Sequence, residues 1–117
     1  MTSEVRIEGR VFVRAAHRRA VTPERGTVVR VRRYEVALFD VGGDVVAYEN
    51  ACPHQGGPIG EGFVESGTVT CPWHAWCFDL RTGTLTLGDF ARLRRFDVHV
   101  EGSELYVAAE PVEGSAW

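Results

Sequence analysis

The sequence predicts an all-β fold of small antiparallel sheets, arranged as a sandwich or a partly open barrel. Short stretches that alternate apolar and polar residues recur along the chain, and turns rich in Gly separate them. No window carries a long apolar period of 3.6 residues, and the best helical candidate, residues 15–20, is too short for a stable helix. Strands that follow one another this closely are typical of antiparallel sheets.

The expected strands can be given in chain order. Residues 11–13 open the series, and residues 27–32 alternate Val with Arg, as expected of a strand with one solvated face. Residues 35–41 and 44–49 flank Gly42-Gly43, a pair that favours the tight turn of a β-hairpin. Further strands are expected at residues 67–71, 77–80, 84–87, 94–100 and 104–108, with turns at 81–83 and 101–103.

The size and composition indicate one ordinary globular domain. The chain has 117 residues, of which 44% are hydrophobic and 25% charged. We therefore expect a single domain over residues 1–117, with a flexible tail at about 111–117. The formal net charge is −3 and every basic residue is Arg, which disfavours nucleic acid as a partner because nucleic-acid-binding domains usually carry a basic excess.

The compartment is expected to be the cytoplasm. Charged residues and Gly interrupt the apolar stretches long before the roughly 20 residues that a membrane helix needs. The first residues show neither an apolar signal core nor a twin-arginine signal. Three cysteines are present, and if Cys52 and Cys71 bind a metal, only Cys77 remains, so no internal disulfide is expected. We expect Cys77 to be a small packed residue rather than a reactive thiol.

Two loops interrupt the strand pattern, and both carry metal-ligand side chains. Residues 52–62 contain two Pro and four Gly in eleven residues, which rules out a regular strand. A second loop, residues 71–74, follows a predicted strand. Its sequence is Cys-Pro-Trp-His, and the first loop begins Cys-Pro-His, so each loop contributes one Cys and one His.

These four residues, Cys52, His54, Cys71 and His74, form the candidate metal site. Structural zinc sites use the same atoms, but they commonly pair Cys with Cys and His with His on each loop, or use four Cys. One thiolate and one imidazole from each loop suit a cluster with two inequivalent irons better. Structural zinc and a chance placement of core residues are the competing hypotheses.

The two loops resemble those of the Rieske ferredoxin family. The resemblance lies in Cys-Pro-His-Gln-Gly-Gly-Pro-Ile-Gly-Glu-Gly at residues 52–62 and in Val-Thr-Cys-Pro-Trp-His-Ala-Trp-Cys-Phe-Asp-Leu-Arg-Thr-Gly at residues 69–83, and the strand pattern accommodates residues 27–108. It implies one [2Fe–2S] cluster in a cluster-binding subdomain at about residues 50–90. Cys52 and Cys71 would then ligate the buried iron, and His54 and His74 the outer iron, from which electrons leave.

The residues around the ligands indicate where this chain would stand within the family. In high-potential members, cysteines bridge the two loops and hydroxyls of a Ser and a Tyr donate to cluster sulfurs. The matching positions here are Gly57 and Trp73 for the bridge, Trp76 for the Ser and Phe78 for the Tyr. Without those hydroxyls, the reduction potential is expected to fall toward about −150 mV, the low end for Rieske centres.

Several roles remain open for the residues beside the ligands. Gly56, Gly57, Gly60 and Gly62 either let backbone N–H groups approach the sulfides or are ordinary turn glycines. Trp73 and Trp76 either shield the cluster, form an apolar docking rim or pack in the core. Two positions depart from the family pattern: Ala75 replaces the usual Gly, and residues 87–91 lack the Pro of the third loop, so that Phe90 is the expected cover.

The resemblance and the short chain together favour an electron carrier rather than an enzyme. The leading hypothesis is a ferredoxin that accepts single electrons from a flavin-dependent reductase and passes them to a terminal oxygenase, docking transiently near His54 and His74. One alternative is the small Rieske-like subunit of an assimilatory nitrite reductase, in which the acceptor is a terminal reductase. Another is a redox-inert structural metal-binding module.

Overall fold

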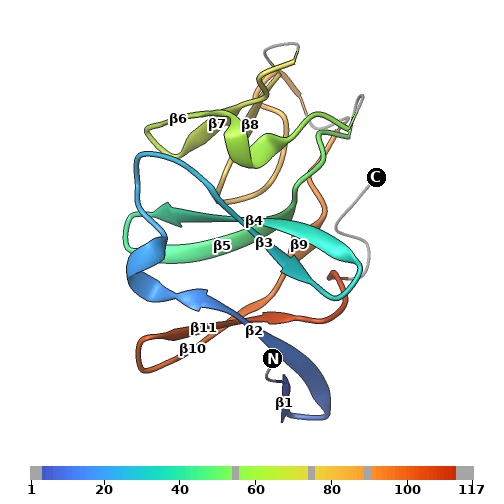
Figure 1. The fold of residues 1–117 in the computed structure, drawn as a ribbon. Helices are drawn as coiled ribbons and strands as arrows, with labels where there is room; N and C mark the ends of the chain where they lie inside the picture. Colours follow the sequence, from blue (N-terminus) through green and yellow to red (C-terminus); the bar gives the residue numbers. More distant parts are fainter. Residues whose placement is uncertain (1–3, 54–55, 74–75, 89–90, 113–117) are drawn as a thin grey trace.

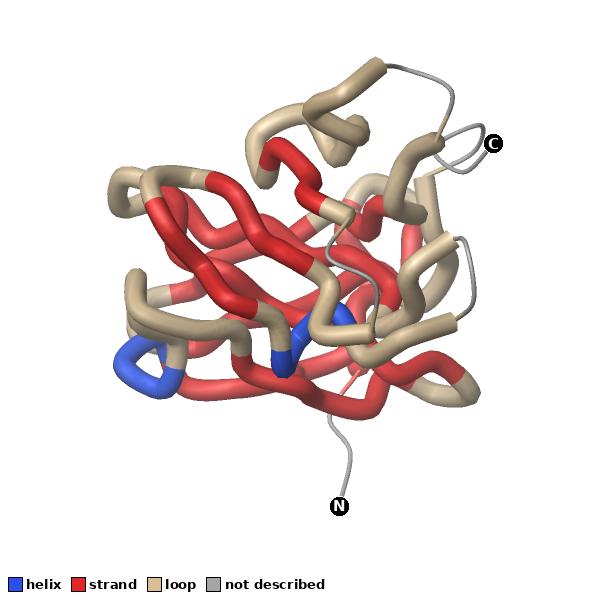
Figure 2. Tube along the Cα trace, turned by 90° about the horizontal axis from the view of Figure 1, so that it is seen from above, coloured by secondary structure: helices blue, strands red, loops and turns tan. Residues whose placement is uncertain are grey.

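The structure, a computed structural model, describes residues 4–53, 56–73, 76–88 and 91–112. Its strands form three antiparallel sheets, stacked one above another in Figure 1. Figure 2 shows that strands and loops make up nearly all of the trace, with two short helical segments, the 3₁₀ turns η1 (Arg18–Ala20) and η2 (Ile59–Glu61). The predicted all-β class is therefore confirmed. Within the described ranges, no helix has the length and apolar character needed to cross a membrane.

The first sheet lies at the lower end of the view in Figure 1 and has the strand order β1-β2-β11-β10. It consists of β1 (Glu4–Ile7), β2 (Arg10–His17), β10 (Val98–Glu101) and β11 (Glu104–Ala108). The prediction for residues 11–13 was too short, and β1 was not predicted. The segment 15–20, set aside as too short for a stable helix, divides in two: residues 15–17 continue β2, where Ala16 and His17 pair with β11, and residues 18–20 form η1.

The central sheet has the order β3-β4-β5-β9 and consists of β3 (Thr27–Val31), β4 (Tyr34–Val41), β5 (Asp44–Glu49) and β9 (Arg95–Phe96). Gly42 and Gly43 have φ angles of 61° and 95°, the two left-handed residues of a tight hairpin turn. The predicted β4–β5 hairpin is therefore confirmed. The predicted strand at 94–100 breaks at Asp97, so β9 pairs with β5 while β10 joins the first sheet.

The third sheet is small and has the order β6-β7-β8, with β6 (Phe63–Glu65), β7 (Thr68–Thr70) and β8 (Cys77–Asp79). Strand β6 was not predicted. The predicted strand at 84–87 is wrong: Thr84 and Leu85 form isolated bridges to Arg92 and Phe78, and no longer ladder develops there.

The central sheet is buried on both faces, which explains the uninterrupted apolar run in β4. Val36 and Leu38 belong to a hydrophobic core shared with the first sheet. Ala37 and Phe39 point the opposite way, into a second core that includes the third sheet. This alternation follows from the two-residue period of a strand. The second core is the one that contains Cys52 and Cys71, so the central sheet supports the candidate metal site from below.

Tyr48 links the central sheet to the segment after β8. Its side chain is fully buried, and its hydroxyl donates a 2.6 Å hydrogen bond to the carbonyl of Leu80. Burial raises the pKa of Tyr48 to about 12, a shift that the charge of Asp79 supports and that of Arg95 opposes. The folded protein therefore holds the phenol proton more tightly than the unfolded chain does.

Replacing Tyr48 with Phe is expected to lower the free energy of unfolding near pH 7 by about 1–3 kcal/mol, because the buried carbonyl of Leu80 loses its hydroxyl donor. The contribution of the Tyr48 phenol is complete below its unfolded pKa of about 10 and is lost as the pH rises through about 12. Urea denaturation should therefore show a smaller difference in the free energy of unfolding between the unsubstituted protein and Tyr48→Phe at pH 11 than at pH 7. A difference that widens with pH would contradict this assignment.

Candidate metal centre

The first cysteine-bearing loop, residues 52–58, is closed by backbone hydrogen bonds at Cys52. The Cys52 N–H donates to the carbonyl of Gly57 at 2.8 Å, and the Gly56 N–H donates to the carbonyl of Cys52 at 2.7 Å. Gly56 has a φ of 78°, a conformation that favours glycine. The chain thus reverses within six residues, and the sequence places His54 inside this reversal.

The second loop, residues 71–76, joins β7 to β8 and closes in the same way. The Cys71 N–H donates to the carbonyl of Trp76 at 2.7 Å, the same five-residue span as the Cys52 to Gly57 bond. Strands β7 and β8 end in register beside it, with Thr70 opposite Cys77. A Cys therefore opens each loop, followed by Pro, and the sequence places His74 inside the second one.

Both loop cysteines lie in the second hydrophobic core. Cys52 and Cys71 are each 1% exposed, and no disulfide joins either of them or Cys77. A buried pair of thiols at the base of two closed loops provides soft sulfur ligands away from water, as a buried iron requires.

The predicted imidazole ligands cannot be placed beside these cysteines. His54 and His74 lie outside the described residues, as do Ala75 and Phe90. Among the residues that the structure does describe, no three or more His, Cys, Asp or Glu side chains gather closely enough to hold a metal ion. The complete ligand set of Cys52, His54, Cys71 and His74 therefore stays a prediction.

A direct contact joins the two loops at Gly57. A Cβ atom added to Gly57 would lie 2.9 Å from Sγ of Cys71 and 3.1 Å from both Cγ and Cδ2 of Trp73. Only glycine fits at this distance, because real Cβ atoms do not approach other heavy atoms so closely. Gly57 and Trp73, the positions to which the family resemblance assigns a cysteine bridge, thus face each other. Trp73 remains 61% exposed on its outer side.

The two aromatic residues that take the place of hydroxyl donors are packed differently. Phe78 is fully buried and packs in the same core as Cys52 and Cys71. Trp76 is partly buried against that core, and its ring lies 6.4 Å from the ring of Phe78, centroid to centroid. Neither side chain carries a hydroxyl that reaches toward the thiols.

Asn50 supports the first loop and was not singled out from the sequence. Its Oδ1 accepts a 2.6 Å hydrogen bond from the Gly60 N–H, and its Nδ2 donates to a carboxylate oxygen of Glu35 at 3.2 Å. The side chain therefore ties the turn after the loop to the central sheet. An Asn two residues before a Gly-Pro-rich loop is typical of such local hydrogen bonding, and that is the signal in the sequence.

Neither Gly60 nor Gly62 leaves room for a side chain. A Cβ on Gly60 would lie 2.5 Å from Cγ2 of Val28, and one on Gly62 would lie 2.3 Å from the carbonyl oxygen of Thr70. Gly62 has an ordinary φ of −75°. Both glycines lie in or directly after the 3₁₀ turn η2, and close approach, not backbone conformation, requires glycine there.

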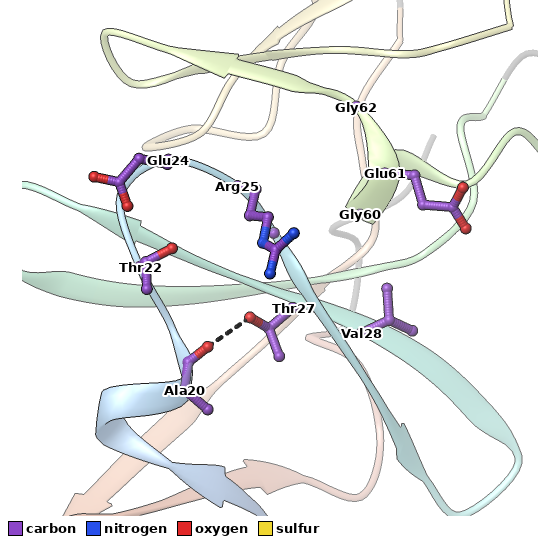
Figure 3. Close-up of a pocket in the computed structure, with 10 residues that line it drawn as sticks. Ala20, Thr22, Glu24, Arg25, Thr27, Val28, Gly60, Glu61 and Gly62 are labelled. Atoms are coloured by element: carbon purple, nitrogen blue, oxygen red, sulfur yellow. Dashed lines mark hydrogen bonds between the residues drawn. The ribbon is translucent and has the colours of Figure 1, made fainter.

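A cavity lies away from the thiols, between the segment before β3 and η2 (Figure 3). Its volume is about 760 Å³, and neither Cys nor His lines it. Arg25 reaches into it, and Thr27 donates a 2.8 Å hydrogen bond to the Ala20 carbonyl at its edge. The cavity therefore contributes no ligand to the candidate metal site.

The fold and the paired loops define a metal-binding β domain, and comparison with known proteins assigns its family. The family model described as "Rieske [2Fe-2S] domain" matches residues 11–97. The chain belongs to this family, and its cofactor is a Rieske-type [2Fe–2S] cluster. The buried cysteines at the start of two matched loops fit the sulfur half of such a cluster.

Curated relatives include ferredoxins and a larger protein. The chain is 42% identical over 74 residues to the ferredoxin subunit of 3-phenylpropionate/cinnamic acid dioxygenase from Shigella boydii, a match that covers 62% of this chain and 70% of that subunit. It is 38% identical over 78 residues to human apoptosis-inducing factor 3, covering 64% of this chain and 13% of that protein.

Solved structures with the same fold include both ferredoxins and other proteins. The ferredoxin of carbazole 1,9a-dioxygenase from Nocardioides aromaticivorans has a TM-score of 0.77 at 32% identity, covering 85% of this chain and 98% of that one. A putative nitrite reductase small subunit from Mycobacterium tuberculosis has a TM-score of 0.76 at 24% identity, covering 88% and 98%, a likeness in fold alone.

Proposed function

We propose that this protein is a cytoplasmic single-electron carrier, not an enzyme, whose cluster is held by Cys52, His54, Cys71 and His74. The observation that carries this proposal is the pair of closed loops, each opened by a fully buried cysteine. When bound, the cluster takes up and releases one electron. The Cys52 and Cys71 thiolates would hold one iron, and the His54 and His74 imidazoles would hold the other.

The chain's own residues support rapid exchange of electrons at the loop end of the molecule. Trp73 is 61% exposed, and Leu87, which follows the Thr86 N–H bonded to the Cys77 carbonyl, is 86% exposed. The described residues of the loops 52–58 and 71–76 carry no charged side chain. Exposed aromatic and aliphatic groups of this kind are typical of contact surfaces. We propose that redox partners dock transiently here, near His54 and His74.

We propose a flavin-dependent reductase as the electron donor and a terminal oxygenase as the acceptor. The relatives named as dioxygenase ferredoxins support the oxygenase as acceptor, as does the solved complex of oxygenase and ferredoxin in carbazole 1,9a-dioxygenase, whose ferredoxin is 27% identical to this chain with a TM-score of 0.77. The small subunit of a nitrite reductase is the alternative acceptor system, supported by likeness in fold.

Stopped-flow absorbance with purified partners tests the carrier role. The holoprotein should be reduced by a ferredoxin reductase and NADH, and then reoxidised by a ring-hydroxylating oxygenase in the presence of its aromatic substrate and oxygen, with product formed only when all components are present. Reoxidation by a nitrite reductase alone would reassign the acceptor. A cluster that neither partner reduces or reoxidises would contradict the carrier role.

The reduction potential is expected to lie near the low end for Rieske centres, about −150 mV. Phe78 is buried in the same core as both cysteines and has no hydroxyl, so the extra negative charge of the reduced cluster would lack that donor. Protein-film voltammetry measures the potential directly. Phe78→Tyr should raise it, by about 59 mV for each tenfold stabilisation of the reduced state. A potential above zero for the unsubstituted protein would contradict the prediction.

A further inference from the structure

We propose that Trp73 is a positioning residue that clamps the second loop onto the first through Gly57 and thereby slows the loss of the cluster. This proposal rests on the ligand set proposed above. The clamp is the contact between the indole of Trp73, the backbone of Gly57 and the sulfur of Cys71. The indole of Trp73 is not itself one of the proposed ligands.

The geometry places the indole directly against the first loop. A Cβ added to Gly57 would lie 3.1 Å from two ring atoms of Trp73. The indole therefore packs directly on the glycine, and any larger residue at position 57 would push the indole away. The same added Cβ would lie 2.9 Å from Sγ of Cys71. One contact therefore fixes the spacing between the first loop and a thiolate ligand on the second loop.

The backbone hydrogen bonds described above close each loop on itself. The bond from Cys52 to Gly57 shapes the first loop, and the bond from Cys71 to Trp76 shapes the second. The proposed cluster takes ligands from both loops, so its release requires the loops to move apart. The contact of Trp73 with Gly57 crosses between them and opposes this movement, and burial of one indole face supplies the driving force.

The exposure of Trp73 separates this role from ordinary core packing. A core tryptophan would be buried, whereas Trp73 is 61% exposed. Its removal is therefore expected to leave the core intact and to loosen only the two loops. Val100 on β10 is 52% exposed and lies in the first sheet, and it provides a matched exposed apolar position away from the loops.

The test is the rate at which the oxidised holoprotein loses its visible absorbance in the presence of an iron chelator. Trp73→Ala should lose the cluster about tenfold faster than the unsubstituted protein, which corresponds to about 1.4 kcal/mol in the barrier. Trp73→Phe, which keeps a ring over Gly57, should stay within about twofold, as should Val100→Ala. Equal rates for Trp73→Ala and Val100→Ala would overturn the proposal.

Two further measurements separate the proposed contact of Trp73 from an effect on general stability and from an error in the proposed ligand set. Thermal unfolding of the apoproteins should give the same midpoint for Trp73→Ala and Val100→Ala, because the clamp acts between the loops and not on the core. A lower midpoint for Trp73→Ala alone would reassign the residue to general stability and overturn the proposal. If the ligand set itself were wrong, the unsubstituted protein would lack a Rieske-type electron paramagnetic resonance signal, whereas failure of the clamp leaves that signal intact.

Discussion

Replacing Cys71 with Ala is expected to abolish cluster binding, with complete loss of the visible absorbance and of the Rieske-type resonance signal after reduction. Sγ of Cys71 is buried in the second core and lies against Gly57 of the other loop, so no neighbouring group can enter to replace it. Iron in such clusters depends on soft thiolate ligands, and a methyl group supplies none. Absorption spectroscopy and iron and sulfide analysis of the purified protein measure the loss.

Cys77→Ala is the matched control for this experiment. Cys77 stands on β8 opposite Thr70, is only partly buried and is not part of the core that contains Cys52 and Cys71. Its replacement should leave the cluster content and the resonance signal unchanged. A Cys71→Ala protein that keeps its signal, or a Cys77→Ala protein that loses it, would remove Cys71 from the ligand set or add Cys77 to it.

The strands that were predicted correctly are those whose local sequence and tertiary position agree. In the hairpin of β4 and β5, the apolar run and the Gly42-Gly43 turn favour the same structure, and the observed φ angles of both glycines confirm it. The ligand set is also a prediction from local features, Cys and Pro at the start of each loop, and it stays a prediction. The buried cysteines agree with it, while His54 and His74 lie outside the described residues.

The elements that were missed depend on distant partners. Residues 94–100 have the composition of one strand, yet β9 pairs with β5 in the central sheet and β10 pairs with β11 in the first sheet. The local sequence does not show that the segment divides between two sheets. Strand β6 has three residues and is defined by its pairing with β7. Residues 84–87 have the composition of a strand, but they form only isolated bridges because no neighbouring strand in the described part of the chain pairs with them along their length.

Single glycines also show that a local sequence pattern does not reveal features that depend on distant partners. Gly42 and Gly43 are required by a local turn, which a sequence pattern reveals. Gly60 and Gly62 are required because Val28 and the carbonyl of Thr70, on other strands, come too close for a side chain. From sequence alone the two kinds look identical, and only the packing of η2 between the central and the third sheet distinguishes them.

Replacing Gly62 with Ala is therefore expected to lower the free energy of unfolding by about 2–3 kcal/mol, a cost typical of overpacking in a filled interior. The added Cβ would lie 2.3 Å from the Thr70 carbonyl oxygen, which is backbone held in the β6–β7 ladder and cannot rotate away. Because Thr70 directly precedes Cys71, the displacement should also reduce cluster occupancy in the purified protein.

Glu61→Ala is the control. Glu61 is the exposed last residue of η2, directly before Gly62, so the Ala side chain there would face solvent. Urea denaturation of both apoproteins, together with the iron content of both holoproteins, measures the effect. If Gly62→Ala lay within about 0.5 kcal/mol of Glu61→Ala, as expected for surface substitutions, the strand end beside Cys71 would be able to yield. The close approach at Gly62 would then not be what holds Cys71 in place.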